Sequence, residues 1–328
     1  MGLELALSTL LSPIVLFFVL GLFAALMRSQ MSVPQDFAKG LAIYLMMAIG
    51  LKGGVAMSKT PVTSEMIGVF IFATALSFAL PFFAYLCLRK FSKLSRVDAA
   101  ATAGHYGSIS IVTFVAATQA VIFSGYTSAG YLVAVAAIME TPAIISALYL
   151  AQRGFKKEGK VVGSERGEVA REVLLNASVV VLVGALLIGL IVGEDGMKTV
   201  EPFFVTPFQG VLCLFLLDMG LSAGRGLRQG WRELDFGSLS FGIYMPVLAA
   251  VFTGIVCGYG MGLNVGDLTI MMVLGASASY IAVPAAMRLA LPKAQPSIYL
   301  TLSLGVTFPF NLTVGIPLYI FIAQMIAG

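Results

Sequence analysis

The sequence predicts an all-α polytopic membrane protein with ten transmembrane helices, arranged as two inverted five-helix repeats. Three observations lead to this fold class: the composition, the spacing of the apolar segments and the placement of the basic residues. Of the 328 residues, 59% are hydrophobic and 11% are charged, whereas soluble domains carry about 25% charged residues. This composition excludes a cytosolic enzyme, a secreted disulfide scaffold and a nucleic-acid-binding protein, and it predicts a lipid bilayer as the solvent.

Hydropathy divides the chain into ten apolar segments, and about 20 apolar residues are enough for a helix to cross a bilayer. The first segment has neither the basic start nor the small-residue cleavage site of a signal peptide, so we expect a retained helix. The ten predicted spans are Leu10–Met27, Phe37–Met57, Met66–Leu88, Val97–Ser124, Ser128–Gln152, Val173–Val192, Pro202–Leu221, Phe241–Gly260, Asp267–Leu289 and Ser297–Ala327.

The longest polar stretch, from Arg153 to Arg171, lies at the middle of the chain. It predicts a cytoplasmic connector over residues 153–171, between a first five-helix repeat (residues 1–152) and a second one (residues 172–328). Because five is an odd number of spans, the second repeat must lie upside down relative to the first. Such inverted repeats are typical of secondary transporters.

Basic residues gather in the loops that follow odd-numbered spans. Of the 20 lysines and arginines, only Lys52, Lys59 and Lys198 fall on the opposite side. Because loops rich in Lys and Arg remain in the cytoplasm, we expect both termini to be non-cytoplasmic, in the inner (plasma) membrane of the cell.

Short sequence matches in corresponding spans support the inversion. In the last pair, a Tyr-Leu start is followed by a proline about ten residues later in both halves. The paired stretches are Gly50–Gly54 with Leu217–Gly224, Ala103–Ser110 with Leu274–Pro284, and Tyr131–Tyr149 with Tyr299–Tyr319.

Glycines and small polar residues interrupt the centres of spans 4 and 9, where continuous apolar helices would be expected. Because freed backbone groups are tolerated in a bilayer only where they line a protein cavity, we expect two broken helices that cross at the midplane. Half-helix amino termini there would bind an anion. The alternative is that small residues only let helices pack closely. The predicted anion-binding residues are Gly104, His105, Tyr106, Gly107, Ser108, Gly275, Ala276 and Ser277.

Glu140 is the deepest ionisable residue in the spans and is followed closely by Pro142. A carboxylate inside a membrane is costly and is a functional candidate by default. Pro142 would free a backbone carbonyl that could share a hard cation with Glu140. The alternative is a protonated structural carboxyl, and Asp218 and Lys52 are weaker candidates because both lie near span ends.

Several stretches resemble the sodium-dependent bicarbonate transporter family, and the likeness runs nearly from end to end. They include an acidic-X-Pro-Ala element in span 5. The stretches are Ile49–Met57, Val97–Gly104, Glu140–Ala143, Leu291–Ser297, Gly315–Leu318 and Ala323–Gln324.

This resemblance implies a core domain that moves against a gate domain, a homotrimer, and bicarbonate and sodium held between the two broken helices, with no organic cofactor. The implied sodium-binding residues are Ser108, Ser110, Glu140, Ser279 and Asn311. Tyr280 stands where the family pattern has an acidic residue, which leaves the sodium stoichiometry open. Family members regulated by a PII-like protein have a longer connector, so that partner stays open too.

The sequence therefore favours sodium-coupled uptake of a small anion, with bicarbonate as the expected substrate. One alternative on the same fold is a cation/proton antiporter or an organic-anion carrier, in which Glu140 and His105 handle protons. A membrane-embedded hydrolase using Ser108 or Ser110 with His105 is disfavoured, because no acidic residue is placed to orient the histidine.

Overall fold

The computed structural model describes residues 11–58, 61–157, 177–280, 283–284, 287, 291 and 293–328. Every regular element in these residues is helical. Residues 158–176, which include most of the predicted connector, lie outside the described residues. The first residues of the predicted connector, from Arg153 to Lys157, are helical and continue the helix of span 5.

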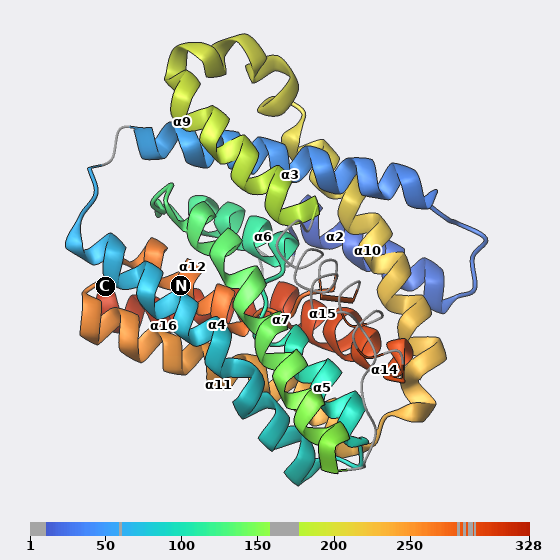
Figure 1. The fold of residues 1–328 in the computed structure, drawn as a ribbon. Helices are drawn as coiled ribbons and strands as arrows, with labels where there is room; N and C mark the ends of the chain where they lie inside the picture. Colours follow the sequence, from blue (N-terminus) through green and yellow to red (C-terminus); the bar gives the residue numbers. More distant parts are fainter. Residues whose placement is uncertain are drawn as a thin grey trace.

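The helices follow one another in the order drawn in Figure 1. In the first half they are α2 (Pro13–Leu26), α3 (Gln35–Ser58), α4 (Ser64–Phe91), α5 (Arg96–His105), α6 (Ile111–Phe123) and α7 (Leu132–Lys157). In the second half they are α9 (Ala177–Phe204), α10 (Phe208–Gly230), α11 (Phe236–Ile255), α12 (Val265–Ala276), α14 (Pro296–Leu300), α15 (Phe308–Phe310) and α16 (Ile316–Ala327).

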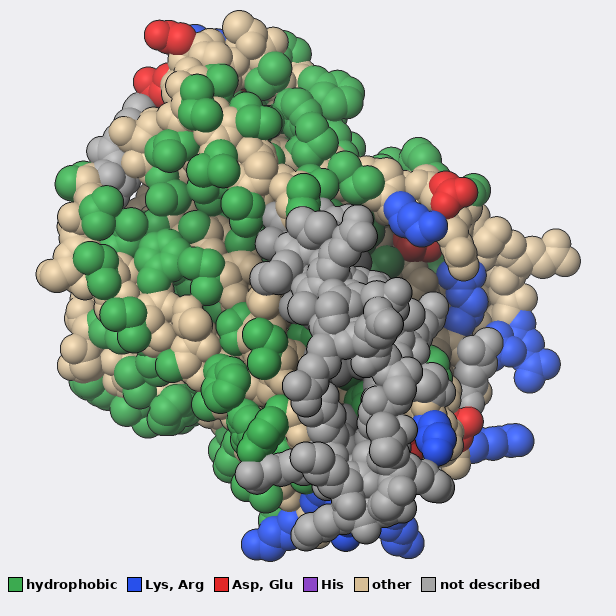
Figure 2. All heavy atoms as spheres, viewed as in Figure 1, with side chains coloured by type: hydrophobic (Ala, Val, Ile, Leu, Met, Phe, Trp, Pro, Cys, Tyr) green, Lys and Arg blue, Asp and Glu red, His purple; other side chains and the backbone are tan. Residues whose placement is uncertain are grey.

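Six of the described helices are long and apolar enough to cross a membrane. They are α3, α4, most of α9, most of α10, α11 with the π-helical turn Val256–Gly260, and the continuous helical run Pro296–Ala327. Shorter apolar helices occupy four further predicted spans. Figure 2 shows a broad hydrophobic face, with Lys and Arg side chains gathered at its lower and right edges. This surface fits a multi-pass membrane protein.

Both predicted interruptions are present. In span 4, α5 ends at His105 and α6 begins at Ile111. In span 9, α12 ends at Ala276, and Ser277–Tyr280 are not helical. Span 10 differs from the sequence expectation because π-helical segments at 301–307 and 311–315 flank Pro309. A proline removes a backbone donor, and π-bulges commonly absorb such a gap.

A second difference concerns the boundary between spans 6 and 7. The predicted seventh span starts at Pro202, but this residue belongs to α9, which bends at Gly193. Gly193 has a φ of 59°, a backbone conformation that glycine adopts without steric cost. The bend lets the last turns of α9 run in a new direction, so α10 begins only at Phe208.

A buried aspartate in α5 ties the two halves of the chain together. Ser95 caps this helix by accepting from the Asp98 backbone N–H at 3.1 Å, and its hydroxyl donates to the Asp98 carboxylate at 2.5 Å. The other carboxylate oxygen accepts from the backbone N–H of Gln295 at 2.8 Å. This variant of a capping box therefore anchors the beginning of the last span.

α12 has an equivalent aspartate anchor, which ties the second half of the chain to the first. Asn264 caps the helix by accepting from the Asp267 N–H at 3.0 Å, and its amide donates to the Asp267 carboxylate at 2.7 Å. The other oxygen of Asp267 accepts from the backbone N–H of Ala129 at 2.6 Å, just before α7. Each broken helix thus fixes the start of the fifth span of the opposite half.

Two helix pairs, α3 with α9 and α2 with α10, pack through glycines. A Cβ added at Gly54 would lie 2.0 Å from the carbonyl oxygen of Leu186. At Gly21 it would lie 2.1 Å from the carbonyl oxygen of Leu217. The backbones approach so closely that no larger residue fits, which is how membrane helices associate.

Candidate functional site at the two helix breaks

Backbone hydrogen bonds interlock the breaks in spans 4 and 9. The N–H of Ser279 donates to the carbonyl of His105, the last residue of α5, at 2.8 Å. In the reverse direction, the N–H of Ser110 donates to the Ser277 hydroxyl at 3.1 Å. Each break therefore satisfies a backbone group that the other one frees, which is the condition for irregular backbone inside a membrane.

His105 is fixed in one orientation by two contacts. Its Nδ1 lies 2.5 Å from the carbonyl oxygen of Ser279, and its ring stacks on Tyr299 with the centroids 4.7 Å apart. Because a carbonyl can only accept, the hydrogen bond assigns the proton to Nδ1. Nε2 is buried and has no hydrogen-bond partner, so its lone pair is available to a donor.

The last span reaches the end of α12 through Asn311. The amide nitrogen of this residue donates to the carbonyl of Ala276 at 2.8 Å, and its oxygen accepts from the hydroxyl of Tyr319 at 3.0 Å. An amide oxygen has two lone pairs, so one of them is still free to face a cation. Asn311 thus satisfies a carbonyl at the break and keeps an acceptor there.

Tyr106, the first residue after α5, is held by contacts with the last span and with α11. Its hydroxyl lies 2.7 Å from the Thr307 hydroxyl, which donates to the carbonyl of Gly242 at 2.7 Å. Its ring meets that of Phe241 edge to face, 4.6 Å between centroids. Tyr106 therefore forms part of the wall of the candidate site, and its hydroxyl already makes a hydrogen bond within the protein.

Unpaired buried polar atoms gather around these breaks. Among the described residues, seven buried side-chain polar atoms lack a hydrogen-bond partner. Each such group costs about 1–3 kcal/mol, and native structures contain few of them. Their concentration indicates a place that binds polar ligands. Five of the seven belong to α5, α7 and the two breaks: Thr102, His105, Ser108, Glu140 and Tyr280.

Tyr280 lies at the end of the second break. It is buried at 8% exposure, its ring packs edge to face on Phe308, and its hydroxyl lies near Ser110 without hydrogen-bond geometry. A tyrosine at this position offers a neutral hydroxyl. It cannot supply the negative charge that an acidic residue would give to a cation.

Glu140 lies in α7, which packs against α4 and α5. Its side chain is 5% exposed and its Oε2 has no partner. The carbonyl of the preceding residue, Met139, accepts from the Ser77 hydroxyl at 2.5 Å. Among the described residues, no hydrogen bond joins Glu140 to the other four residues of the predicted sodium set. Three of these four, Ser108, Ser110 and Ser279, lie in the two breaks.

The glycines of the predicted anion site are positions of close packing. A Cβ added at Gly104 would lie 2.6 Å from a side chain of α7, and one at Gly107 would lie 2.4 Å from Pro81. At Gly275 it would lie 2.5 Å from the Thr253 hydroxyl. These contacts favour the packing interpretation for the three glycines. The polar candidates of the site are the residues between them.

Asp98 and Asp267, the two aspartates that anchor the broken helices, were not among the predicted functional residues. The signal was present as Ser95 and Asn264, each three residues before an aspartate, a spacing typical of helix amino termini. Lys52 and Asp218 were considered as site residues. Asp218 is buried in α10, whereas Lys52 lines a separate cavity between α3 and α9.

An all-helical, multi-pass membrane protein with unpaired polar groups at two interlocked helix breaks has the architecture of a transporter for small polar solutes. The chain belongs to the Na+-dependent bicarbonate transporter superfamily, whose family model matches residues 13–324. Among curated proteins, none matches this sequence. The family confirms the resemblance drawn from the sequence, and with it a transport role rather than an enzymatic one.

Proposed function

We propose that this protein is a secondary active transporter that couples sodium to the uptake of a small anion, bicarbonate, by alternating access. The observation that carries the proposal is the group of unpaired buried polar atoms on α5, α7 and the two breaks. Buried groups of this kind are compensated when a ligand supplies the missing partners. Family membership supplies the chemical identity of the ligands.

The anion is bound beside the amino terminus of α6, where Ser110 is the capping residue. A helix of this length offers free N–H groups and a partial positive charge at its start. Ser108 adds an unpaired hydroxyl as a donor, whereas the Ser277 hydroxyl already donates to the carbonyl of Leu274. Nε2 of His105 accepts the O–H of a protonated oxyanion, because its Nδ1 proton is already used. This combination of donors and one acceptor matches hydrogencarbonate.

Sodium binds to oxygen ligands supplied by Glu140, Asn311 and the serines Ser108, Ser110 and Ser279. Hard cations prefer carboxylate, hydroxyl and carbonyl oxygens. Moving one anion inward against the membrane potential costs about 2.3 kcal/mol per 100 mV. One accompanying sodium ion cancels this electrical cost, and a second one would add driving force.

The protein consists of two inverted five-helix repeats, in the topology with both termini outside the cytoplasm, and each repeat contributes helices to both a gate and a core. The mirrored aspartate anchors support this arrangement, because Asp98 and Asp267 play the same part in opposite halves. The glycine-packed pairs α2/α10 and α3/α9 also exchange under the same symmetry, and they form the gate against which the remaining helices move. A homotrimer and a PII-like regulator are further predictions from the resemblance.

The test is uptake of labelled bicarbonate into proteoliposomes, with and without an inward sodium gradient. We expect uptake that depends on the sodium gradient, and that increases with an inside-negative potential only if more sodium ions than anions move. Exchange of sodium for protons without uptake of bicarbonate would instead establish the antiporter, and uptake of an organic anion in place of bicarbonate would establish the organic-anion carrier. The absence of any sodium-dependent uptake would refute the proposal.

A further inference from the structure

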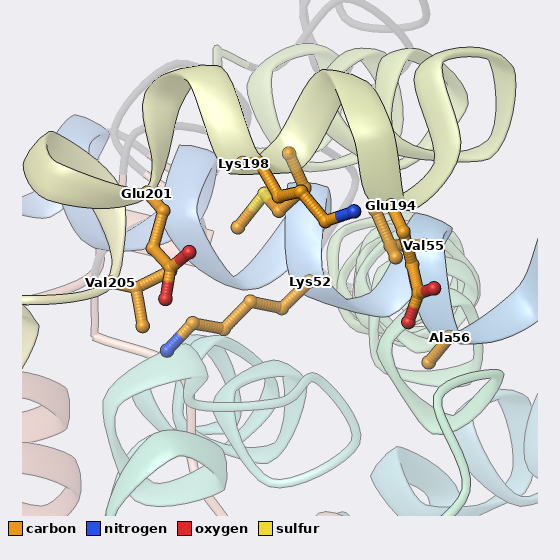
Figure 3. Close-up of a pocket in the computed structure, with 8 residues that line it drawn as sticks. Lys52, Val55, Ala56, Glu194, Lys198, Glu201 and Val205 are labelled. Atoms are coloured by element: carbon orange, nitrogen blue, oxygen red, sulfur yellow. The ribbon is translucent and has the colours of Figure 1, made fainter.

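A second cavity, separate from the helix breaks and lined by both charged and apolar side chains, lies between the end of α3 and the bent part of α9 (Figure 3). Its volume is about 670 Å³. The bend at Gly193 brings the last turns of α9 over α3, so that Lys52 on one helix faces Glu201 on the other. Lys198 and Glu194 line the opposite end.

The wall of this cavity is held in place by aromatic packing. The hydroxyl of Tyr44, on α3, donates to the carbonyl of Phe203 at 2.5 Å. The Tyr44 ring also contacts both Phe203 and Phe204, with centroids 5.4 and 5.6 Å away. These contacts fix the last turn of α9, and therefore fix Glu201 relative to Lys52.

Lys52 is a half-buried cation without a partner carboxylate. Its Nζ lies 4.5 Å from the centre of the Phe208 ring, and it makes no ion pair with any described acidic residue. A cation–π contact leaves the three ammonium hydrogens able to donate. Lys198 differs, because it pairs with Asp195 at 2.9 Å on the exposed side of the helix.

Placing a carboxylate opposite this ammonium selects between kinds of anion. An anion without a proton is attracted by Lys52 but repelled by Glu201. An oxyanion that carries a proton can accept from Lys52 and donate its O–H to Glu201, so both charged groups contribute to binding. Discrimination of this kind depends on a repulsive element as much as on an attractive one.

We propose that the cavity between Lys52 and Glu201 is a second binding site for a hydrogen-bearing oxyanion, through which the substrate is loaded and selected before it reaches the helix breaks. The identification of this oxyanion as hydrogencarbonate rests on the proposed function. Two of the three basic residues on the predicted outer side, Lys52 and Lys198, line this cavity. At about 30 Å³ per water, the cavity holds an anion together with hydration water, which suits a weak loading site.

The test uses acetate as the matched competitor, because it replaces the O–H of hydrogencarbonate by a methyl group. A Met197→Trp reporter in the cavity wall, in a Trp231→Phe background, gives the protein one tryptophan, since the sequence contains only Trp231. The protein in lipid nanodiscs is titrated with bicarbonate and with acetate at constant sodium and ionic strength. We expect a saturable response that is at least tenfold weaker for acetate.

Two variants separate the attractive and repulsive groups. Lys52→Met should abolish the response to both anions, whereas Glu201→Gln should remove the preference over acetate and make acetate a competitor of bicarbonate uptake. Lys39→Met is the matched control, because Lys39 is an exposed lysine on the same helix that pairs with Asp36. It should change neither response.

Equal responses to bicarbonate and acetate, or an unchanged response in Lys52→Met, would overturn the inference. If the reporter chain does not fold, half-saturation for uptake decides instead. It should rise about tenfold in Lys52→Met and stay unchanged in Lys39→Met, since 1.4 kcal/mol corresponds to a factor of ten. A reporter response without sodium-driven uptake would refute the proposed function alone, and uptake without a response would refute the loading site alone.

Discussion

The helix pairs α2/α10 and α3/α9 differ from the region of the two helix breaks in how small residues are used. In the pairs, glycines bring backbones into direct contact, as at Gly54 and Gly21. Within the described side chains, none of the seven unpaired buried polar atoms lies in these four helices. Around the breaks, glycines pack equally closely. However, five buried polar atoms without a partner remain on α5, α7 and the two breaks.

This difference separates packing from binding in a membrane protein. A small-residue motif alone indicates close approach of helices, and Gly104, Gly107 and Gly275 make contacts of this kind. Unpaired polar atoms are not explained by packing, because an apolar residue of the same shape would remove their cost. We therefore expect the polar residues near these glycines to bind the ligands, and the glycines to position them.

The largest effect is expected where the glycine packing is broken. In Gly54→Val the new side chain meets the carbonyl of Leu186, so α3 and α9 must separate, and we expect a destabilisation of about 3 kcal/mol or more. The measurement is the thermal midpoint of the purified protein, followed by size-exclusion chromatography. Gly40→Val on the same helix is the control, because a Cβ at Gly40 meets nothing within 4 Å. Equal losses in both variants would contradict the close contact.

A smaller effect is expected when one of the mirrored anchors is removed. Asp98→Ala and Asp267→Ala each leave a partly buried backbone N–H and the side chain of the capping residue without a partner, which costs about 2 kcal/mol. The two losses in the free energy of unfolding should be similar, because the anchors are equivalent in the two halves. Asp98→Asn keeps an acceptor for Gln295 and should recover most of the stability. A large loss in only one half would contradict the proposed symmetry.

Much of the fold could be predicted from hydropathy alone. The breaks in spans 4 and 9 were predictable because glycine and serine replace apolar residues there. The bend at Gly193 and the π-helical turns around Pro309 were not, because both depend on which neighbouring helix absorbs the freed backbone groups. Boundaries such as the start of α10 therefore differ from the predicted ones, although the structure has a helix in each predicted span.

The site was less predictable than the fold. The sequence could name His105 and Ser108 as polar residues in an apolar span. It could not distinguish Tyr106, whose hydroxyl is bonded to Thr307, from Ser108, whose hydroxyl has no partner. That distinction depends on contacts between residues about 200 positions apart, which no local pattern encodes.

The carboxylate of Glu140 provides the next test of the comparison. Glu140→Gln removes one charge from the proposed cation site while it keeps the shape of the side chain. We expect the sodium concentration for half-maximal uptake to rise about tenfold, since 1.4 kcal/mol of lost ligand binding is a factor of ten. Glu65→Gln, at an exposed position in the first turn of α4, is the control. If the sodium dependence of Glu140→Gln equals that of the control, Glu140 is only a structural carboxyl.

The smallest effects are expected at two buried serines. The hydroxyl of one has no hydrogen-bond partner, and the hydroxyl of the other has one. Ser108 has an unpaired hydroxyl, whereas the Ser77 hydroxyl donates to the carbonyl of Met139. Ser108→Ala therefore loses no hydrogen bond within the protein, and its free energy of unfolding should change by less than about 0.5 kcal/mol. Ser77→Ala removes a buried hydrogen bond to the carbonyl of Met139 and should cost about 1 kcal/mol.

Transport should respond in the opposite order. Bicarbonate affinity should fall several-fold in Ser108→Ala, because a donor to the anion is lost, and it should be nearly unchanged in Ser77→Ala. Half-saturation for uptake and thermal unfolding, measured on the same two preparations, give both comparisons. If Ser108→Ala lost stability and kept its affinity, the unpaired hydroxyl would belong to the packing, and the distinction between the glycine-packed pairs and the helix breaks would fail at this residue.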